Sequence, residues 1–167
     1  MQNMAMNEID GAPLTSFDDL DRRLLDLLQR DASRTNQSLA EAAAVSPATA
    51  LRRVRRLVES GVIARQVALL APAFERAGLS ALSEVSLDRQ GAEHLDAFEA
   101  RAVADGAVQQ CYRVSPGPDF VVIAWVPDMA AWNAVVQRLF TQDANVRNVK
   151  TFFSVKRAKF DPRVDVR

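Results

Sequence analysis

The stretch from Ser46 to Gly61, SPATALRRVRRLVESG, constrains the fold of this chain more than any other. At about 100° per residue of a helix, its apolar and basic side chains separate onto two faces. Ser46 is a suitable N-cap, Pro47 suits the first helical position and Gly61 suits the C-terminal stop. The stretch therefore predicts an amphipathic helix that docks on a small core. Its apolar face holds Ala50, Leu51, Val54, Leu57 and Val58, and its opposite face holds Thr49, Arg52, Arg53 and Arg56, with Arg55 on the flank.

A basic helix face has two interpretations. It is either a solvated surface or a binding face for a polyanion such as DNA. The whole chain contains 21 basic and 21 acidic residues, so its net charge of zero does not favour a polyanionic partner. Residues 46–70, however, carry five arginines and only one acid, Glu59, so the positive charge is local. The elements around this helix have to decide between the two interpretations.

Two further helices are expected before the basic one. Residues 17–31 have leucines at helical spacing and acids in the first turn. Residues 39–44 predict a short, alanine-rich helix with Asn36 or Ser38 as its cap. Three helices, with a tight turn between the last two, are typical of a helix-turn-helix. Residues 62–70 are rich in β-branched side chains and predict a strand, either a wing or a strand leading out of the domain.

The second half of the chain alternates strands and helices. Residues 120–126 form an almost continuous apolar run, which predicts a central strand buried on both faces. The element order βαββαβ is that of the ferredoxin-like split arrangement. The expected strands are residues 79–87, 108–114, 120–126 and 146–155, and the expected helices are residues 93–105 and 129–140.

Several classes of site and location are excluded by composition. A single cysteine, Cys111, and a single histidine, His94, do not suffice for a disulfide, a cysteine-based zinc site or a histidine cluster. No apolar run approaches the ~20 residues of a membrane-spanning helix. The N-terminus lacks the basic start and apolar core of a secretory signal. We therefore expect a cytoplasmic protein with no metal, no cofactor and no membrane partner.

Residues 20–63 resemble the helix-turn-helix of the leucine-responsive regulator/AsnC (Lrp/AsnC) family of transcriptional regulators. The βαββαβ half is similar to the effector domain of that family. The sequence ALLAP at residues 68–72 resembles its interdomain strand, and VPDM at residues 126–129 resembles the start of its second helix. The resemblance covers about residues 17–160 and implies an α+β protein. Such a protein has an N-terminal winged helix-turn-helix of three helices and a C-terminal ferredoxin-like βαββαβ effector and oligomerisation domain.

The resemblance also implies what the protein binds. It would be a transcriptional regulator that binds double-stranded operator DNA as a homodimer, with tetramer and octamer left open. Its activity or assembly would respond to an amino acid or a related small metabolite. The expected division is a flexible tail at residues 1–16, the DNA-binding domain at 17–66, an interdomain strand or linker at 67–78, the effector domain at 79–160 and a C-terminal tail at 161–167.

The candidate DNA-binding residues come from the basic helix. Thr49, Arg52 and Arg56 point outward together and match the dimensions of the major groove. Pro47 and Ala48 lie at the N-terminal end, near base edges. For Arg53, a phosphate contact and an ion pair with an acid of the first helix are both open. The full set is Ser46, Pro47, Ala48, Thr49, Arg52, Arg53 and Arg56.

The candidate effector site is the turn before residues 120–126. In the family, this turn carries a Gly-x-x-Asp pattern that holds the amino-acid ligand. Here Asp119 matches, but Pro116 stands where the family has glycine, and a proline removes one N–H donor. Either the ligand is not an ordinary α-amino acid in the usual pose, or the site is degenerate and Asp119 only caps the turn. The candidate residues are Ser115, Gly117, Asp119 and Thr151.

Two other functions remain as alternatives. Tetrapyrrole decarboxylases resemble this two-domain architecture, but such enzymes need ionisable groups, histidine above all, around a large cofactor. This chain has one histidine and no catalytic constellation, so we expect no enzyme. The other alternative is an oligomerisation module with a degenerate effector site that has lost operator binding. The arginine face of the basic helix argues against that module.

Overall fold

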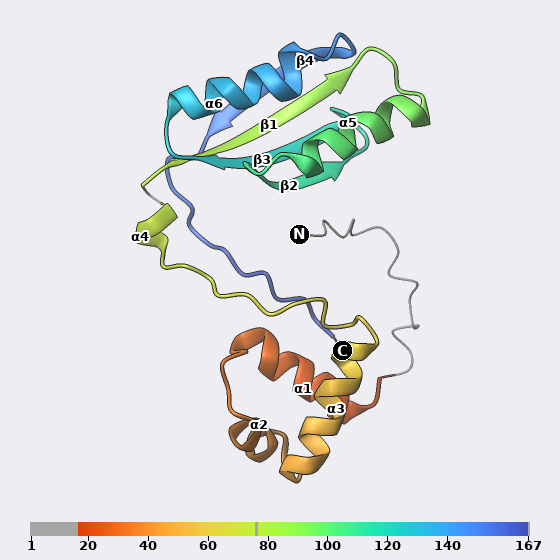
Figure 1. Ribbon diagram of the computed structural model, residues 1–167, viewed down its shortest axis with the longest axis vertical. Coiled ribbons are helices and arrows are strands. Elements are labelled where there is room, and N and C mark those ends of the chain that lie inside the picture. The colour runs from red at the N-terminus through yellow and green to blue at the C-terminus, as the bar shows by residue number, and fades with distance from the viewer. Residues whose placement is uncertain (1–16, 76, 167) are drawn as a thin grey trace. The chain divides into compact units, whose positions relative to one another are not determined.

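The computed structural model describes residues 17–75 and 77–166, so the tail expected at residues 1–16 lies outside the described residues. The chain divides into two compact units, which are described separately (Figure 1). Of the described residues, the first unit holds those up to Ala68 together with those from Phe160 onward, and the second holds those between Leu69 and Lys159. Within the described residues, no helix is long and apolar enough to cross a membrane.

The first unit is a bundle of three helices, α1 (Asp19–Arg30), α2 (Asn36–Ala43) and α3 (Pro47–Glu59). The predicted helix-turn-helix is therefore confirmed. Each helix begins at a side-chain cap, which satisfies backbone N–H groups that would otherwise lack a partner. The cap of α2 is Thr35 and not Asn36 or Ser38, because the Thr35 hydroxyl accepts the Ser38 N–H at 3.1 Å. The core of the bundle is made by Leu24, Leu25, Leu39, Ala40, Ala43, Ala50 and Leu57.

The strand expected at residues 62–70 is not formed. These residues have no regular secondary structure, and a single helical turn, α4 (Pro72–Glu75), follows them. A strand needs a hydrogen-bonded neighbour, and the one sheet of the described chain contains only strands from the second unit. Val67, Leu69 and Leu70 are accordingly exposed. High β-propensity alone does not make a strand where no partner strand is present.

The second unit contains one four-stranded antiparallel sheet with the strand order β2-β3-β1-β4. The predicted βαββαβ order is therefore confirmed. The second helix ends in a π-helical turn, which follows directly on α6. The elements are β1 (Leu79–Leu87), α5 (Ala92–Ala104), β2 (Val108–Arg113), β3 (Phe120–Val126), α6 (Met129–Val136), the π-helical turn η2 (Gln137–Thr141) and β4 (Val146–Phe153).

Both helices of the second unit cover the same face of the sheet (Figure 1). The core between them is aromatic, and the ring centroids of Phe98 and Phe120 lie 4.7 Å apart. Along β3, fully buried residues alternate with partly buried ones. In the single chain, the burial expected on both faces of β3 is therefore found only on the helix-covered face. Its apolar side chains on the uncovered face have no covering layer in the described residues.

Candidate DNA-binding face and effector loop

The start of α3 is fixed by three local interactions. The Ser46 hydroxyl accepts the Thr49 N–H at 3.2 Å, and Pro47 occupies the first turn without losing a needed donor. The Asn36 side chain donates to the Pro47 carbonyl oxygen at 2.9 Å, which joins the beginnings of α2 and α3. Ala50 and Leu57 are buried and attach the helix to the core. The predicted orientation of α3 is therefore present, although Leu51 and Val58 of its apolar face are each about half exposed.

An ion-pair network joins the middle of α3 to the first turn of α1. Arg53 Nη1 donates to Asp18 Oδ2 at 2.6 Å and to Asp21 Oδ1 at 3.2 Å. Arg56 also donates to Asp21, whose side chain is fully buried. The intradomain pair left open for Arg53 is thus formed, and it includes Arg56 as well. These two arginines position α3 against α1. Their outward location on the helix did not by itself indicate this role.

The acids of this network also cap α1. The Asp21 N–H donates to Asp18 Oδ1 at 2.9 Å, and the Asp18 N–H donates back to Asp21 Oδ2 at 3.3 Å. The backbone hydrogen bond from Asp21, together with Arg53, holds the pKa of Asp18 below its usual value. The hydrogen bond to Asp18 raises the pKa of Arg53. Sequence reasoning missed Asp21, although the acid pair three residues apart at the start of a helix was the available signal.

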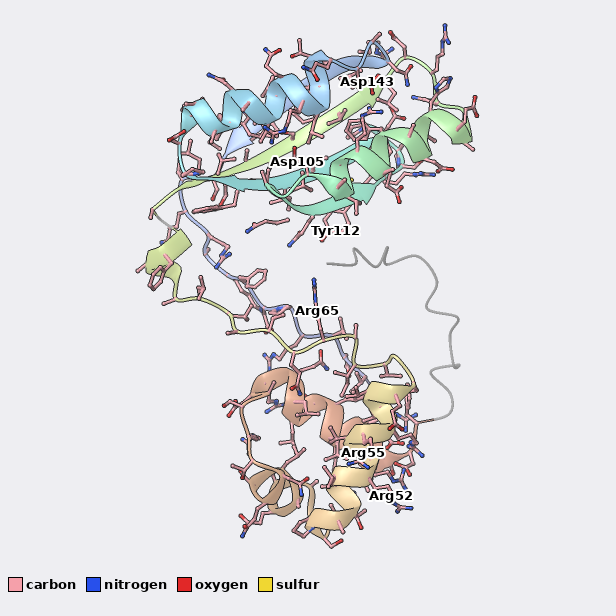
Figure 2. The ribbon with its side chains drawn as sticks, viewed as in Figure 1. Arg52, Arg55, Arg65, Asp105, Tyr112 and Asp143 are labelled. Atoms are coloured by element: carbon pink, nitrogen blue, oxygen red, sulfur yellow. The ribbon has the colours of Figure 1, made fainter. Side chains whose placement is uncertain are left out.

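Arg52 and Arg55 are the arginines of α3 that the network leaves out. Both are exposed, and neither forms an ion pair within the described residues. Figure 2 shows that both side chains come from α3, away from the core. Arg55, which the helix pattern put on the flank, therefore joins Arg52 as an available cation. Of the other candidate residues on α3, Ser46, Pro47 and Ala48 are exposed and Thr49 is partly exposed.

The candidate effector loop joins β2 to β3. Its Ser115–Pro116 peptide bond is cis, and Gly117 has φ of +126°, a conformation that favours glycine. One oxygen of the Asp119 carboxylate accepts the Leu87 N–H at 2.7 Å, and the Asp119 N–H donates to the Val85 carbonyl oxygen at 2.9 Å. In the single chain, Asp119 therefore holds the loop against the end of β1, through contacts to residues more than 30 positions earlier in the sequence.

Thr151 lies in β4, on the other side of β1 from the loop. Its hydroxyl is hydrogen-bonded to the Ser83 hydroxyl at 2.9 Å, and the two residues are paired across the β1–β4 ladder. Ser83 is buried, so this hydroxyl pair lies on the helix-covered face of the sheet. The structure thus gathers Ser115, Gly117 and Asp119 in one loop and places Thr151 two strands away.

The described residues contain no group of three histidine, cysteine, aspartate or glutamate side chains that could hold a metal ion. Cys111 is partly buried, and this burial raises the pKa of its thiol to about 11. The thiol therefore stays protonated at neutral pH, which makes it a poor nucleophile and a poor metal ligand. This agrees with a packing role for Cys111.

Comparisons with known families match both units. Residues 17–64 match a family described as winged helix-turn-helix DNA-binding. Residues 80–164 match a family described as the Lrp/AsnC ligand binding domain. The first match spans the three helices, and the second spans the sheet, its helices and most of the C-terminal segment.

Curated relatives and solved structures are similar over nearly the whole chain. An uncharacterised HTH-type transcriptional regulator of Haemophilus influenzae is 32% identical over 148 residues, which is 89% of this chain and 88% of the relative. The leucine-responsive regulatory protein of Salmonella typhimurium is 29% identical and covers 93% of this chain and 94% of its own. An AsnC family transcriptional regulator from Agrobacterium tumefaciens has a TM-score of 0.80 and 28% identity, covering 89% of this chain and 96% of its own. A transcriptional regulator from Neisseria meningitidis, solved as a complex with L-Met, has a TM-score of 0.79, 28% identity and the same coverage.

Proposed function

Because this chain belongs to the Lrp/AsnC family of DNA-binding transcriptional regulators, we propose which of its residues contact DNA, which face pairs two copies and which loop holds the effector. The protein has a helix-turn-helix for DNA and an amino-acid-binding domain of the family type. The family consists of transcriptional regulators.

The proposed recognition surface is the exposed side of α3 and its first turn. The supporting observation is that Arg52 and Arg55 are exposed and without an ion pair among the described residues, whereas Arg53 and Arg56 are held by Asp21. Free guanidinium groups bind guanine edges and phosphates without first breaking an internal pair. Arg53 and Arg56 then act mainly by orienting α3. The proposed DNA contacts are Ser46, Pro47, Ala48, Thr49, Arg52 and Arg55.

We further propose that two copies pair through the uncovered face of the sheet. The ladder registers place Phe152, Leu82 and Ile123 side by side across three strands, on the face away from α5 and α6. Leu82 is 37% exposed and Phe152 is 47% exposed, and Tyr112 on the same face is 51% exposed. A second copy would cover this apolar row. Pairing would also supply two recognition helices for half-sites about one helical turn apart.

Replacing Leu82 with glutamate is expected to dissociate the homodimer, because the change buries a carboxylate at the centre of the paired face. Sedimentation velocity at a fixed concentration measures the change in mass. Val103→Glu is the matched control, since Val103 is 60% exposed on α5, on the helix side. We expect this control to sediment like the unmodified protein. A homodimer that persists in Leu82→Glu but is lost in Val103→Glu would contradict the proposed pairing face.

An amino acid is the proposed effector, and the loop between β2 and β3 is its proposed site. The support is the match of residues 80–164 to a ligand-binding domain and the likeness to a regulator solved with L-Met. In the single chain, one Asp119 oxygen already accepts the Leu87 N–H, so the loop is held in shape before a ligand arrives. Ser115, Gly117 and Asp119 are the proposed loop contacts, with Thr151 as a further contact from β4.

Isothermal titration against a panel of amino acids that includes L-Met is expected to detect at least one ligand. Thr151→Val removes the hydroxyl that is paired with Ser83 and is expected to weaken binding by about three- to tenfold, the effect of one hydrogen bond. Thr141→Val is the control, because Thr141 is exposed in η2. Uniform absence of binding across the panel would contradict the proposal and favour a degenerate site. Equal affinity in both variants would exclude Thr151 from the site.

A further inference from the structure

The residues after β4 return to the DNA-binding unit. The chain crosses from the first unit to the second after Ala68, and it crosses back after Lys159. Residues 160–166 therefore belong to the same compact unit as α1, α2 and α3, although they follow the last strand of the other unit. The resulting connection is double: one segment leads out of the DNA-binding unit and another leads back to it.

One glutamine of α1 holds the returning segment. The Val164 N–H donates to Gln29 Oε1 at 2.8 Å, and Gln29 Nε2 donates to the Val164 carbonyl oxygen at 3.1 Å. Both backbone groups of Val164 are thus paired by a single side chain, as a neighbouring strand would pair them. The two residues are 135 positions apart in the sequence. A glutamine amide can do this because it carries a donor and an acceptor together.

Charged side chains surround this contact. Within the segment, Arg163 donates to both oxygens of Asp161, at 2.9 and 2.7 Å. The hollow between the segment and α1 is lined by Arg22, Arg23, Asp26, Asp161, Arg163 and Asp165. Val164 itself is 68% exposed, so little apolar area is buried. Exposed polar contacts of this kind contribute little net stability. The docked segment can therefore be released at a small free-energy cost.

We propose that residues 160–166 form a strap that couples the effector-binding unit to α1 of the DNA-binding unit. With the strap docked, the DNA-binding unit is held by two segments, which restricts its orientations and raises its effective concentration at the second half-site. The strap leaves directly from β4, the strand that carries Thr151. A ligand that displaces β4 therefore shifts the equilibrium between the docked and the released strap. A small difference in ligand affinity between the two states suffices for this shift, because the docked state is weakly held.

The docking is tested by the hydrogen-exchange rate of the Val164 amide, which is measured by NMR on the full chain. Gln29→Ala removes both bonds to Val164, and we expect its amide to exchange at least fivefold faster. Gln37→Ala is the control, because Gln37 is a glutamine of α2 whose side chain bonds only Glu41 among the described residues. Equal Val164 exchange in the unmodified protein and in Gln29→Ala would overturn the docking.

The proposed coupling rests on the proposed function. It is tested by measuring operator binding with and without the amino acid that titration identifies. Gln29→Ala is expected to weaken operator binding about three- to tenfold and to reduce the effector response. Val164→Pro breaks the same contact from the segment side by removing the N–H, with Val155→Pro as its control outside the contact. Unchanged binding and response in both contact variants would overturn the coupling. If the unmodified protein bound no DNA, the proposed function would fail, whereas Val164 exchange would still decide the docking.

Discussion

Replacing Arg52 with alanine is expected to weaken operator binding by about 10- to 100-fold at fixed salt. Arg52 is exposed on α3 and has no ion pair within the described residues, so its guanidinium is available to a guanine edge (Figure 2). A good bidentate contact to a base contributes about 1–3 kcal/mol of discrimination. Fluorescence anisotropy with a labelled operator fragment, at one fixed ionic strength, measures the loss. We expect sedimentation velocity to show that the same variant still assembles as a homodimer.

Two further arginine variants serve as a charge control and as a test of a phosphate contact. Arg147→Ala removes the same charge from an exposed position in β4 and is expected to leave operator affinity nearly unchanged. Arg55→Ala tests the phosphate contribution, because loss of one phosphate contact lowers the log–log salt slope by about 0.9. If Arg52→Ala bound the operator as tightly as Arg147→Ala does, α3 would not be the recognition helix.

Replacing Asp21 with alanine is expected to lower the free energy of unfolding of the DNA-binding unit by about 2–4 kcal/mol. The Asp21 carboxylate is fully buried, accepts hydrogen bonds from Arg53 and Arg56, and forms half of the capping box of α1. Its removal leaves the two guanidinium groups without their shared partner. The loss falls below that of a wholly buried pair because the Arg56 side chain is 53% exposed and can turn to water.

Urea unfolding followed by two probes assigns this loss to the correct unit. Both tryptophans of the chain, Trp125 and Trp132, lie in the second unit. Far-UV circular dichroism reports all helices, so the Asp21→Ala transition should move in dichroism and stay in place in tryptophan fluorescence. Asp19→Ala, whose side chain is 93% exposed, is the control and is expected to change little. Equal shifts for Asp19→Ala and Asp21→Ala would contradict the structural role of the buried carboxylate.

Sequence reasoning succeeded where the information is local. The N-cap at Ser46, the proline after it and the apolar spacing of Ala50 and Leu57 depend on neighbours within a few residues, and all of them are found in α3. The network around Asp21 was anticipated only in part: an ion pair between Arg53 and an acid of the first helix was left open, but neither Asp21 nor Arg56 was identified as a member. Asp21 and its two arginines are 32 and 35 residues apart, and a helix pattern indicates direction without indicating which element lies there. Arg56 does point outward, but toward α1.

The strand expected at residues 62–70 is absent and β3 is covered on one face only, and the two observations share one reason. Residues 62–70 have β-branched side chains, and residues 120–126 are almost continuously apolar, so both suggested neighbours on every side. Such patterns indicate that a partner is needed without indicating whether the same chain provides it. The first segment has no partner strand in the described chain, and β3 has one face left partly exposed. A second copy pairing through the face of Leu82 and Phe152 would supply the missing layer for β3.

The effector loop shows the same division between local and distant information. The glycine at residue 117 is a local requirement of the turn, since Gly117 has φ of +126°. The contact of Asp119 is not local, because its carboxylate accepts the N–H of Leu87, 32 positions earlier in the sequence. The bond between Thr151 and Ser83 joins residues 68 positions apart, so spacing along the chain did not indicate it. Thr151 therefore has a structural partner in the single chain, which an effector would have to share or replace.

Genome-wide mapping of bound DNA by chromatin immunoprecipitation tests the central claim most directly, with the unmodified protein compared with Arg52→Ala in the same cells. The unmodified protein is expected at discrete sites that share two half-sites about one helical turn apart. Those sites should disappear in Arg52→Ala and change in occupancy when the bound amino acid is added. Uniform background for both proteins, or the same sites retained by Arg52→Ala, would contradict a DNA-binding regulator that recognises its operator through α3.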